Sequence, residues 1–307
     1  MKSALITGAS GLLGQEVAAL LQSQGWEVRG LSRRPRSADG IHWYEWDPSR
    51  SVLDETSLED LDVLIHLAGE GIADGRWTEG RKREIIQSRV QSCDLLAASV
   101  RRKRAEGKAP GAIVLASAIG YYGSRGDEWL VEDSKPGTGF LSETTLEWEK
   151  AGDFPDDIRQ VRLRIGIVLS RNGGALPQME RPLRFFAGAV PGSGNQYLSW
   201  IHQRDMARII QFAAETQLRG TFNATAPEPE SMDSFMRKLG SAIGRPVYLP
   251  NVPSFALRLM MGEMSEMVLG GARVSSEKIQ REGFQFEFPN LEKALGDLYG
   301  QTVSAEG

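Results

Sequence analysis

The sequence predicts an α/β fold in which a doubly wound parallel sheet carries a smaller C-terminal lobe. Over the first two thirds of the chain, short runs rich in β-branched residues alternate with helical stretches, which is typical of βαβ units. Three glycines at three-residue spacing follow the first of these runs. Residues 171–199 break the alternation with many glycine, proline and aromatic residues. We therefore expect a main domain at 1–230, in which 170–200 shape a cleft, and a terminal lobe at 231–303.

The individual elements follow from these patterns in chain order. Short apolar or β-branched runs predict strands over 3–7, 27–32, 62–68, 112–118, 159–169 and 220–225. Helical periodicity predicts helices between them over 11–24, 80–104 and 142–152. Two more helices are expected over 231–244 and 252–271. The last is rich in methionine, which fits core packing of a small lobe or an adaptable apolar wall over a ligand.

Composition excludes several classes of protein. The 307 residues carry a formal net charge of -4, so no overall positive field favours nucleic acid or an anionic membrane. No run reaches the roughly 18 apolar residues of a membrane span, and the N-terminus does not resemble a signal peptide. The single cysteine, Cys93, excludes an intrachain disulfide and suits a reducing compartment. We expect a cytoplasmic protein that binds neither nucleic acid nor membranes.

Gly8, Gly11 and Gly14 join the first expected strand to the first expected helix. Glycine is needed where the backbone turns tightly, where an anion approaches main-chain N–H groups and where a helix packs closely on a strand. The N-terminus of the following helix offers N–H donors and positive potential to a pyrophosphate. No Gly-Lys-Ser/Thr follows, so a P-loop is not expected. The loop predicts Rossmann-type dinucleotide binding, with a purely structural turn as the alternative.

The end of the second expected strand predicts which dinucleotide is bound. A site for NAD usually places an acid there, where it binds the ribose 2′-hydroxyl. Here Leu31 is followed by Ser32, Arg33 and Arg34. An arginine would bind a 2′-phosphate through charge-assisted, often bidentate hydrogen bonds, and the alternative is a solvated loop arginine. We therefore predict NADP(H) rather than NAD(H).

The third expected strand ends in Leu67, Ala68 and Gly69, whose small size lets a cofactor lie against the backbone. His66 lies inside that strand, where a packed histidine is expected rather than a catalytic one. His42 has no evident partner, and neither histidine has the spacing of a metal ligand. We expect no metal site.

Several longer motifs carry a resemblance to a known family. The glycine loop, LAG at 67–69, SAIGYYG at 117–123 and WIHQRDMA at 200–207 resemble the extended short-chain dehydrogenase/reductase superfamily. More narrowly, the chain resembles the atypical "epimerase family" members of that superfamily, which are similar to nucleoside-diphosphate-sugar epimerases and carry a C-terminal domain of unassigned role. The motifs behind this narrower resemblance are GRWTEGRKREIIQSR, FLSETTLEWE, GSGNQYLSWIH and LGGARVSSEKIQREGFQFEFPNLEKAL. Together they cover nearly the whole chain and are highly specific.

The resemblance implies a Rossmann fold, an NADP cofactor and a substrate lobe built from 170–200 and the C-terminus. It places Ser32 and Arg33 at the adenosine phosphate, and it brings Glu84 and Arg89 to the cofactor, although they would otherwise be an ordinary exposed helix pair. The expected cofactor-binding residues are Thr7, Gly8, Ser10, Gly11, Leu12, Leu13, Gly14, Ser32, Arg33, Leu67, Ala68, Gly69, Glu84 and Arg89. Because dimers are common in the superfamily, a homodimer is a further possibility.

The sequence departs from the catalytic pattern of the superfamily. That pattern is Tyr-x-x-x-Lys with a Ser or Thr, in which the tyrosine exchanges a proton with the substrate and the lysine lowers the tyrosine pKa. The matching positions here hold Phe140 and Thr144, and the usual Ser or Thr is Ala118. The standard acid/base pair is therefore absent.

The hydroxyl groups near the end of the fourth expected strand, where the ligand crevice should lie, are the remaining candidates. We name Tyr122 and Ser117 as candidate catalytic residues, with packing or a turn hydrogen bond as the alternative for each. Ser117 neighbours the usual position, but adjacent side chains on a strand point to opposite faces. Tyr121 and Glu143 are weaker options. His202 either faces substrate or caps the following helix, and the structural role is favoured.

Two functions from different classes remain open. The first is an NADP(H)-dependent oxidoreductase or epimerase acting on a small carbonyl or alcohol, or on a nucleotide-sugar. The second is a cofactor-binding protein with little catalysis, acting as a redox sensor or interaction partner, which the missing Tyr-x-x-x-Lys favours. Hydride transfer needs only a positioned nicotinamide, so the source of the proton separates the two.

Overall fold

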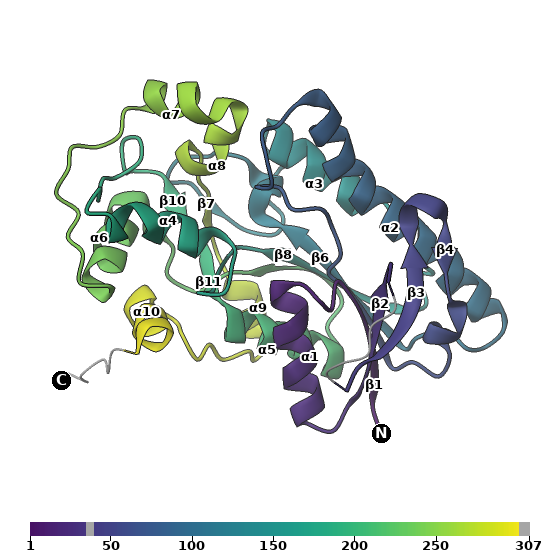
Figure 1. Ribbon diagram of the computed structural model, residues 1–307. Coiled ribbons are helices and arrows are strands. Elements are labelled where there is room, and N and C mark those ends of the chain that lie inside the picture. Colours follow the sequence, from purple (N-terminus) through teal and green to yellow (C-terminus); the bar gives the residue numbers. More distant parts are fainter. Residues whose placement is uncertain (35–39, 301–307) are drawn as a thin grey trace.

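A parallel sheet forms the centre of the molecule (Figure 1). The computed structural model describes residues 1–34 and 40–300, so residues 301–303 of the expected terminal lobe lie outside the described residues. The order of the described strands in the sheet is β12-β8-β6-β5-β1-β2-β3-β4. The strands are β1 (Ser3–Thr7), β2 (Glu27–Ser32), β3 (His42–Asp47), β4 (Val52–Leu53), β5 (Val63–His66), β6 (Ala112–Ala118), β8 (Arg159–Ile165) and β12 (Gly220–Ala224). The β3–β4 pair is antiparallel and the other pairs are parallel.

The strand order confirms the doubly wound class. The chain runs outward from β1 through β2 to β3, and then returns to place β5 on the other side of β1. The resulting switch point between β1 and β5 is where ligands bind in open α/β sheets, just beyond the carboxyl ends of the strands. β3 and β4 were not among the expected strands. β3 mixes aromatic with charged residues, β4 has only two residues, and Trp46 is the one residue of the two strands that is buried.

Helices cover both faces of the sheet (Figure 1). They are α1 (Leu12–Ser23), α2 (Glu79–Ala105), α3 (Phe140–Lys150) and α5 (Gln203–Glu215). On one face, Ile6 of β1 shares a core with Ile210 of α5 and with α1. On the other face, Leu5 of β1 shares a core with Leu96 of α2. Because helices lie on both sides, all five residues of β1 are buried, which is why this strand is a continuous apolar run apart from its ends.

A second core builds the smaller lobe. Trp200, Phe235 and Leu291 are buried together in it, so 169–200 and the C-terminal segment share one apolar interior. Its elements are β9 (Ile167–Leu169), α4 (Ala175–Arg184), β10 (Tyr197–Leu198), β11 (Trp200–His202), β13 (Glu230–Ser231), α6 (Met232–Ala242) and α10 (Leu291–Tyr299). By contrast, α9 (Glu277–Arg281) packs through Ile279 on the core of the main sheet.

The methionine-rich segment differs from its prediction. Instead of one helix over 252–271, the chain forms α7 (Ser254–Met261), the 3-10 turn η4 (Gly262–Ser265) and α8 (Glu266–Leu269). Gly262 has φ 61°, a left-handed conformation that ends α7. No residue of α7 is buried, so the expectation that it packs into a core is wrong.

The remaining short elements connect the strands and helices named above. They are η1 (Pro48–Arg50), η2 (Glu55–Leu58), η3 (Ile119–Tyr122), β7 (Trp129–Leu130) and β14 (Arg273–Val274). Of the helices in the described ranges, none has the length and apolar character that crossing a membrane requires. The same ranges hold no group of three or more His, Cys, Asp or Glu side chains that could bind a metal ion.

Candidate coenzyme site

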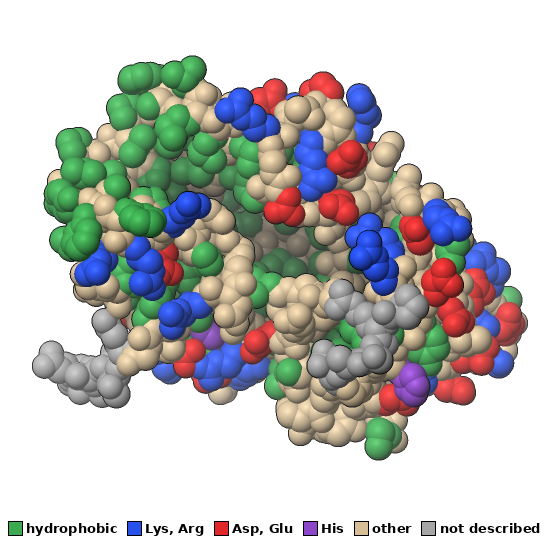
Figure 2. All heavy atoms as spheres, in the orientation of Figure 1, with side chains coloured by type: hydrophobic (Ala, Val, Ile, Leu, Met, Phe, Trp, Pro, Cys, Tyr) green, Lys and Arg blue, Asp and Glu red, His purple; other side chains and the backbone are tan. Residues whose placement is uncertain are grey.

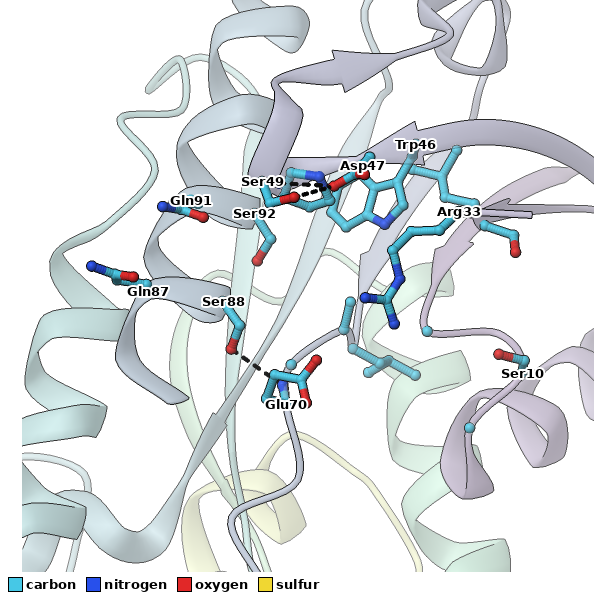
Figure 3. A pocket seen from close by; sticks show the side chains of 18 of the residues that line it. Ser10, Arg33, Trp46, Asp47, Ser49, Glu70, Gln87, Ser88, Gln91 and Ser92 are labelled. Carbon is cyan, nitrogen blue, oxygen red and sulfur yellow. Dashed lines mark hydrogen bonds between the residues drawn. The ribbon is translucent and has the colours of Figure 1, made fainter. Parts of the chain in front are cut away.

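A groove of about 960 Å³ lies at the carboxyl ends of β1, β2, β3 and β5 (Figure 3). It therefore occupies the switch point that the strand order creates. The glycine loop forms one wall, residues 67–70 form the floor, and α2 and η1 form the remaining walls. The expected cofactor residues that line it are Gly8, Ser10, Gly11, Ser32, Arg33, Leu67, Ala68, Gly69 and Glu84.

The glycine loop has the close main-chain packing that requires glycine. Gly8 has φ +70°, and a Cβ on it would lie 3.1 Å from the Ala68 nitrogen. A Cβ on Gly14 would lie 2.1 Å from the Gly8 carbonyl oxygen, far inside contact distance. The N-terminus of α1 is capped by no side chain and has no acid in its first turn, which contains Leu12 and Leu13. Its first N–H groups are therefore free to act as donors for an anion. Leu12, Leu13 and Gly14 do not themselves line the groove.

Thr7 holds the floor of the groove in register with the glycine loop. Its hydroxyl oxygen accepts hydrogen bonds from the N–H groups of Leu67 and Ala68, both at 3.0 Å. The hydroxyl also lies 2.7 Å from Nδ1 of His66, and the Ser92 hydroxyl lies 3.2 Å from Nε2 of that ring. Thr7 is fully buried, so it acts through this network and not by lining the groove.

His66 is a neutral, structural histidine. Burial, together with the nearby charge of Arg89, lowers its pKa to about 4. The Thr7 hydroxyl, which already accepts two N–H bonds, donates to Nδ1, so the ring proton lies on Nε2 and is donated to Ser92. This agrees with the packed role expected for His66.

The end of the groove beside β2 carries two neighbouring arginines, and no acid follows Leu31 at the end of that strand. Ser32, Arg33 and Arg34 all line it, and Figure 3 shows the Arg33 side chain directed into the groove. The Ser32 hydroxyl accepts a hydrogen bond from the Arg34 N–H at 3.2 Å, which shapes the turn after β2. Both arginines therefore line the groove, and the binding of a 2′-phosphate by them stays a prediction.

The wall opposite Arg33 was missed by sequence reasoning. Trp46 and Asp47 end β3, and the Asp47 carboxylate accepts hydrogen bonds from the Ser49 N–H at 3.1 Å and the Ser49 hydroxyl at 2.6 Å. These bonds, the side-chain bond from Ser49 first, lower the Asp47 pKa. The Asp-Pro-Ser sequence is a helix-capping signal that could have located this turn, but only strand pairing brings it beside β2.

The α2 wall combines one expected residue with several that were missed. Glu84 lines the groove and pairs with Arg81 at 3.1 Å. The same wall also contains Gln87, Ser88 and Gln91. These residues follow Glu84 at intervals of three and four, which places them on the same face of the helix. This spacing could have identified them from the sequence. The Ser88 hydroxyl accepts a hydrogen bond at 3.2 Å from the main-chain N–H of residue 70 (Figure 3).

Arg89 is not an exposed partner of Glu84. Only 7% of it is exposed, and its guanidinium lies under Gly69, where a Cβ would approach the guanidinium carbon to 3.2 Å. One nitrogen donates to the Ile85 carbonyl at 2.9 Å, while Nε has no hydrogen-bond partner. The guanidinium also lies 5.0 Å from the centre of the Trp148 ring. Burial lowers the Arg89 pKa to about 10, so the group stays charged at neutral pH.

The two candidate catalytic hydroxyls lie away from the groove. Tyr122 is 0% exposed, and its hydroxyl donates to the Asn223 side-chain oxygen at 2.6 Å and accepts from Arg164 at 3.0 Å. Burial raises the Tyr122 pKa to about 12. Ser117 is buried, and its hydroxyl donates at 2.6 Å to Glu149.

Both hydroxyls therefore belong to one buried network, since Arg164 also forms an ion pair with Glu149 at 2.9 Å. The packing alternative describes Tyr122 and Ser117 better than the catalytic one. His202 is also structural, because its Nδ1 caps α5 by accepting from the Arg204 N–H at 3.1 Å.

The positions that match Tyr-x-x-x-Lys hold no acid or base. Phe140 begins α3, and its ring packs edge-on against Trp77 with 4.7 Å between ring centres. Lys82 lies above the same ring at 5.6 Å. Thr144, one turn further along α3, is 2% exposed, and its hydroxyl has no hydrogen-bond partner. Neither residue can supply the proton that the missing tyrosine would.

Comparison with known proteins identifies the chain. Residues 4–141 match the model of the NAD dependent epimerase/dehydratase family, and 252–298 match a domain of unknown function, DUF1731. The chain is 37% identical over 299 residues to the epimerase family protein YfhF of Bacillus subtilis, covering 95% of this chain and 96% of that protein. The chain belongs to the epimerase family.

Solved structures agree with this family assignment. The crystal structure of human epimerase family protein SDR39U1 with NADPH is 31% identical, with a TM-score of 0.87, and the match covers 98% of this epimerase-family chain and 100% of that one. A UDP-N-acetylglucosamine 4-epimerase from Bacillus cereus is 17% identical with a TM-score of 0.77, over 97% of this chain and 98% of that one, and therefore shares the fold. The resemblance inferred from the motifs is confirmed, and so is the Rossmann-type fold. The chain is an NAD(P)-dependent epimerase-family protein.

Proposed function

We propose that this epimerase-family protein binds NADP(H) and uses it as an oxidoreductase or epimerase on a small carbonyl or alcohol, or on a nucleotide-sugar. The observation that carries the choice of NADP(H) is the pair Arg33 and Arg34 at the end of β2, where an NAD site would place an acid. The similar human protein, whose structure is described as containing NADPH, supports the same choice.

The residues of the groove fit a dinucleotide. A Cβ on Gly14 would clash with the Gly8 carbonyl oxygen at 2.1 Å, and a Cβ on Gly8 or Gly11 would be in tight contact at 3.1 or 3.2 Å. The loop therefore exposes main chain without side chains, and this main chain would meet the pyrophosphate. Arg33 and Ser32 would hold the 2′-phosphate, and the floor at 67–69 would support the middle of the coenzyme. When bound, the coenzyme supplies hydride transfer. The protein binds and orients it.

Arg89 and Glu84 complete the proposed coenzyme site. A buried guanidinium without an acid partner is costly, and here the unpaired Nε of Arg89 lies beneath the floor at Gly69. We infer that an anionic group of the coenzyme offsets this charge. Glu84 lies on the same helix with its carboxylate held by Arg81, which suits it to a ribose hydroxyl.

A second function has its own supporting observation. Phe140 and Thr144 replace the usual acid/base pair, and the hydroxyls of Tyr122 and Ser117 are engaged elsewhere. A protein that binds the coenzyme with little catalysis, as a redox sensor or interaction partner, needs no proton donor. This alternative therefore stands beside the enzyme.

Calorimetric titration of the purified protein with NADPH, NADP⁺ and NADH tests the coenzyme assignment. The assignment is supported if the protein binds NADPH at least about tenfold more tightly than NADH. Equal dissociation constants for the two coenzymes contradict it. Incubation with NADPH and a panel of aldehydes and ketones, and with NADP⁺ and a panel of alcohols and nucleotide-sugars, then tests the chemistry, because an epimerase that oxidises its substrate transiently starts from the oxidised coenzyme. Product with matching oxidation or reduction of the coenzyme indicates an oxidoreductase, and product without net change of the coenzyme indicates an epimerase. Tight binding with no product from any class favours the alternative.

A further inference from the structure

A large apolar surface on the smaller lobe lies apart from the coenzyme groove. Its aromatic members are Phe185, Phe186, Tyr248 and Phe255, which are 75%, 57%, 60% and 74% exposed, and Leu259 and Met260 are 83% and 68% exposed. We call these six side chains the apolar tip. Figure 2 shows hydrophobic side chains gathered over α7 and the adjoining chain at the upper left. None of the six lines the groove.

The apolar tip is held in place and does not belong to a core. The Tyr248 hydroxyl donates to the Phe186 carbonyl at 2.6 Å, and the Tyr248 N–H donates to the Gly188 carbonyl at 3.2 Å. Phe186 has φ 57°, a strained conformation for a residue with a side chain, and Arg245 stacks on its ring at 4.6 Å. α7 has no buried residue at all, although it is almost entirely apolar.

The exposed apolar area of the tip reaches the upper end of what a soluble monomer ordinarily carries in one patch. A large aromatic side chain offers about 150–250 Å². At the exposed fractions above, the four aromatic residues together expose roughly 500 Å². The largest apolar patch on a typical monomer is about 300–600 Å² and often functional. Leu259 and Met260 add to this area, so the tip is a candidate docking surface.

The charges around the tip indicate the chemistry of its partner. The two segments that build it, 181–187 and 245–262, contain no Asp or Glu and four arginines: Arg181, Arg184, Arg245 and Arg258. Arg184 pairs with Glu180, whereas Arg181 and Arg258 are exposed. The acids that flank the two segments, Glu180 and Glu263, form ion pairs with Arg184 and Lys82. In a chain of net charge -4 the tip therefore has a local excess of positive charge. Two copies meeting through this face would bring like charges together, while an anionic surface complements them.

We propose that the apolar tip docks on the surface of an anionic lipid bilayer. The aromatic, Leu259 and Met260 side chains enter the boundary between headgroups and acyl chains, and Arg181 and Arg258 bind lipid phosphates. The protein then lies on the membrane and does not span it. This inference revises the expectation, drawn from net charge, that no membrane is bound. Net charge averages the whole surface, whereas a bilayer senses charge within a Debye length of about 10 Å.

Co-sedimentation with lipid vesicles tests the proposal. The full-length protein should bind vesicles of phosphatidylcholine with phosphatidylglycerol about tenfold more than vesicles of phosphatidylcholine alone, and added salt should weaken the binding. Phe255→Ser with Leu259→Ser should lower the bound fraction about tenfold. Arg181→Glu with Arg258→Glu should remove the preference for phosphatidylglycerol. The exposed Val131→Ser and Arg219→Glu changes, which lie off the tip, are matched controls and should bind as the parent does.

Two results would overturn the proposal. In the first, the protein sediments with neither kind of vesicle, or it sediments equally with both kinds and the substitutions in the tip do not change the bound fraction. The other is a dimer in solution that Phe255→Ser with Leu259→Ser dissociates, since this would assign the tip to a second copy. Because all substituted side chains are exposed, the variants should fold, and thermal unfolding checks this. NADPH affinity should be the same in every variant, so failure here leaves the coenzyme proposal unaffected.

Discussion

Replacing Arg33 with alanine tests the basic end of the groove most directly. A charge-assisted bond between a guanidinium and a phosphate contributes about 1.5–3 kcal/mol. Arg33 is exposed and the groove is open to solvent at this end, so the lower part of that range applies. At about 1.4 kcal/mol per factor of ten, Arg33→Ala should weaken NADPH binding by about 10- to 30-fold. NADH lacks the 2′-phosphate, so its affinity should stay within about twofold.

The assay is calorimetric titration of both coenzymes into the parent protein and two variants. Arg50→Ala is the matched control, because Arg50 is an exposed arginine at the end of η1 that does not line the groove. It should leave both affinities unchanged. The 2′-phosphate assignment would be refuted if Arg33→Ala, and the double variant Arg33→Ala with Arg34→Ala, weakened the binding of NADPH and NADH equally. It would also be refuted if these variants weakened the binding of neither coenzyme. The glycine-loop argument would survive that result.

Three further predictions follow from the contacts around the groove. Gly14→Ala should abolish coenzyme binding and destabilise the fold by about 1–3 kcal/mol, because its Cβ would lie 2.1 Å from a main-chain oxygen. Gly80→Ala at the start of α2 is the matched control and should not lower thermal stability, because its Cβ would meet only the Thr78 hydroxyl at 3.9 Å, an ordinary contact. Equal losses of stability in the two variants would disprove the close-packing argument. The pKa of His66 is about 4 in the folded protein, below the value of 6.5 in the unfolded chain. As the pH falls, the unfolded chain therefore binds the proton first. The free energy of unfolding should fall by about 3 kcal/mol as the pH drops from about 6.5 to 4. Urea unfolding of His66→Gln should show a pH dependence smaller by that amount, and an unchanged dependence would count against a buried neutral ring. Tyr122→Phe should cost about 1–3 kcal/mol of stability, because it leaves the buried Asn223 side-chain oxygen unpaired. The affinity for NADPH should be unchanged. If the variant instead lost NADPH affinity and kept the stability of the parent protein, Tyr122 would belong to the coenzyme site.

The sequence by itself determined the features that depend on local backbone chemistry. Gly8 is required by its φ of +70° and Gly14 by its contact with the Gly8 carbonyl oxygen, both within the loop itself, so their spacing predicted the turn. Arg33 follows directly on a strand whose place beside β1 is common to this class of fold, so its position was also predictable. The alternation of strands and helices was enough for the doubly wound class.

Only the tertiary structure decided the rest, because it depends on contacts between distant parts of the chain. Tyr122 is separated by 101 positions from Asn223, and only the packing of β12 near η3 removes its hydroxyl from the candidate site. Asp47 reaches the wall of the groove only because β3 pairs with β2. The burial of Arg89 beneath Gly69 is likewise visible only in the folded structure, where its face of α2 is turned inward. α7 is apolar by composition, but composition cannot say whether an apolar helix has found a core. Burial is a property of the neighbours that the whole chain supplies, and no residue of α7 is buried by the part of the chain that the structure describes.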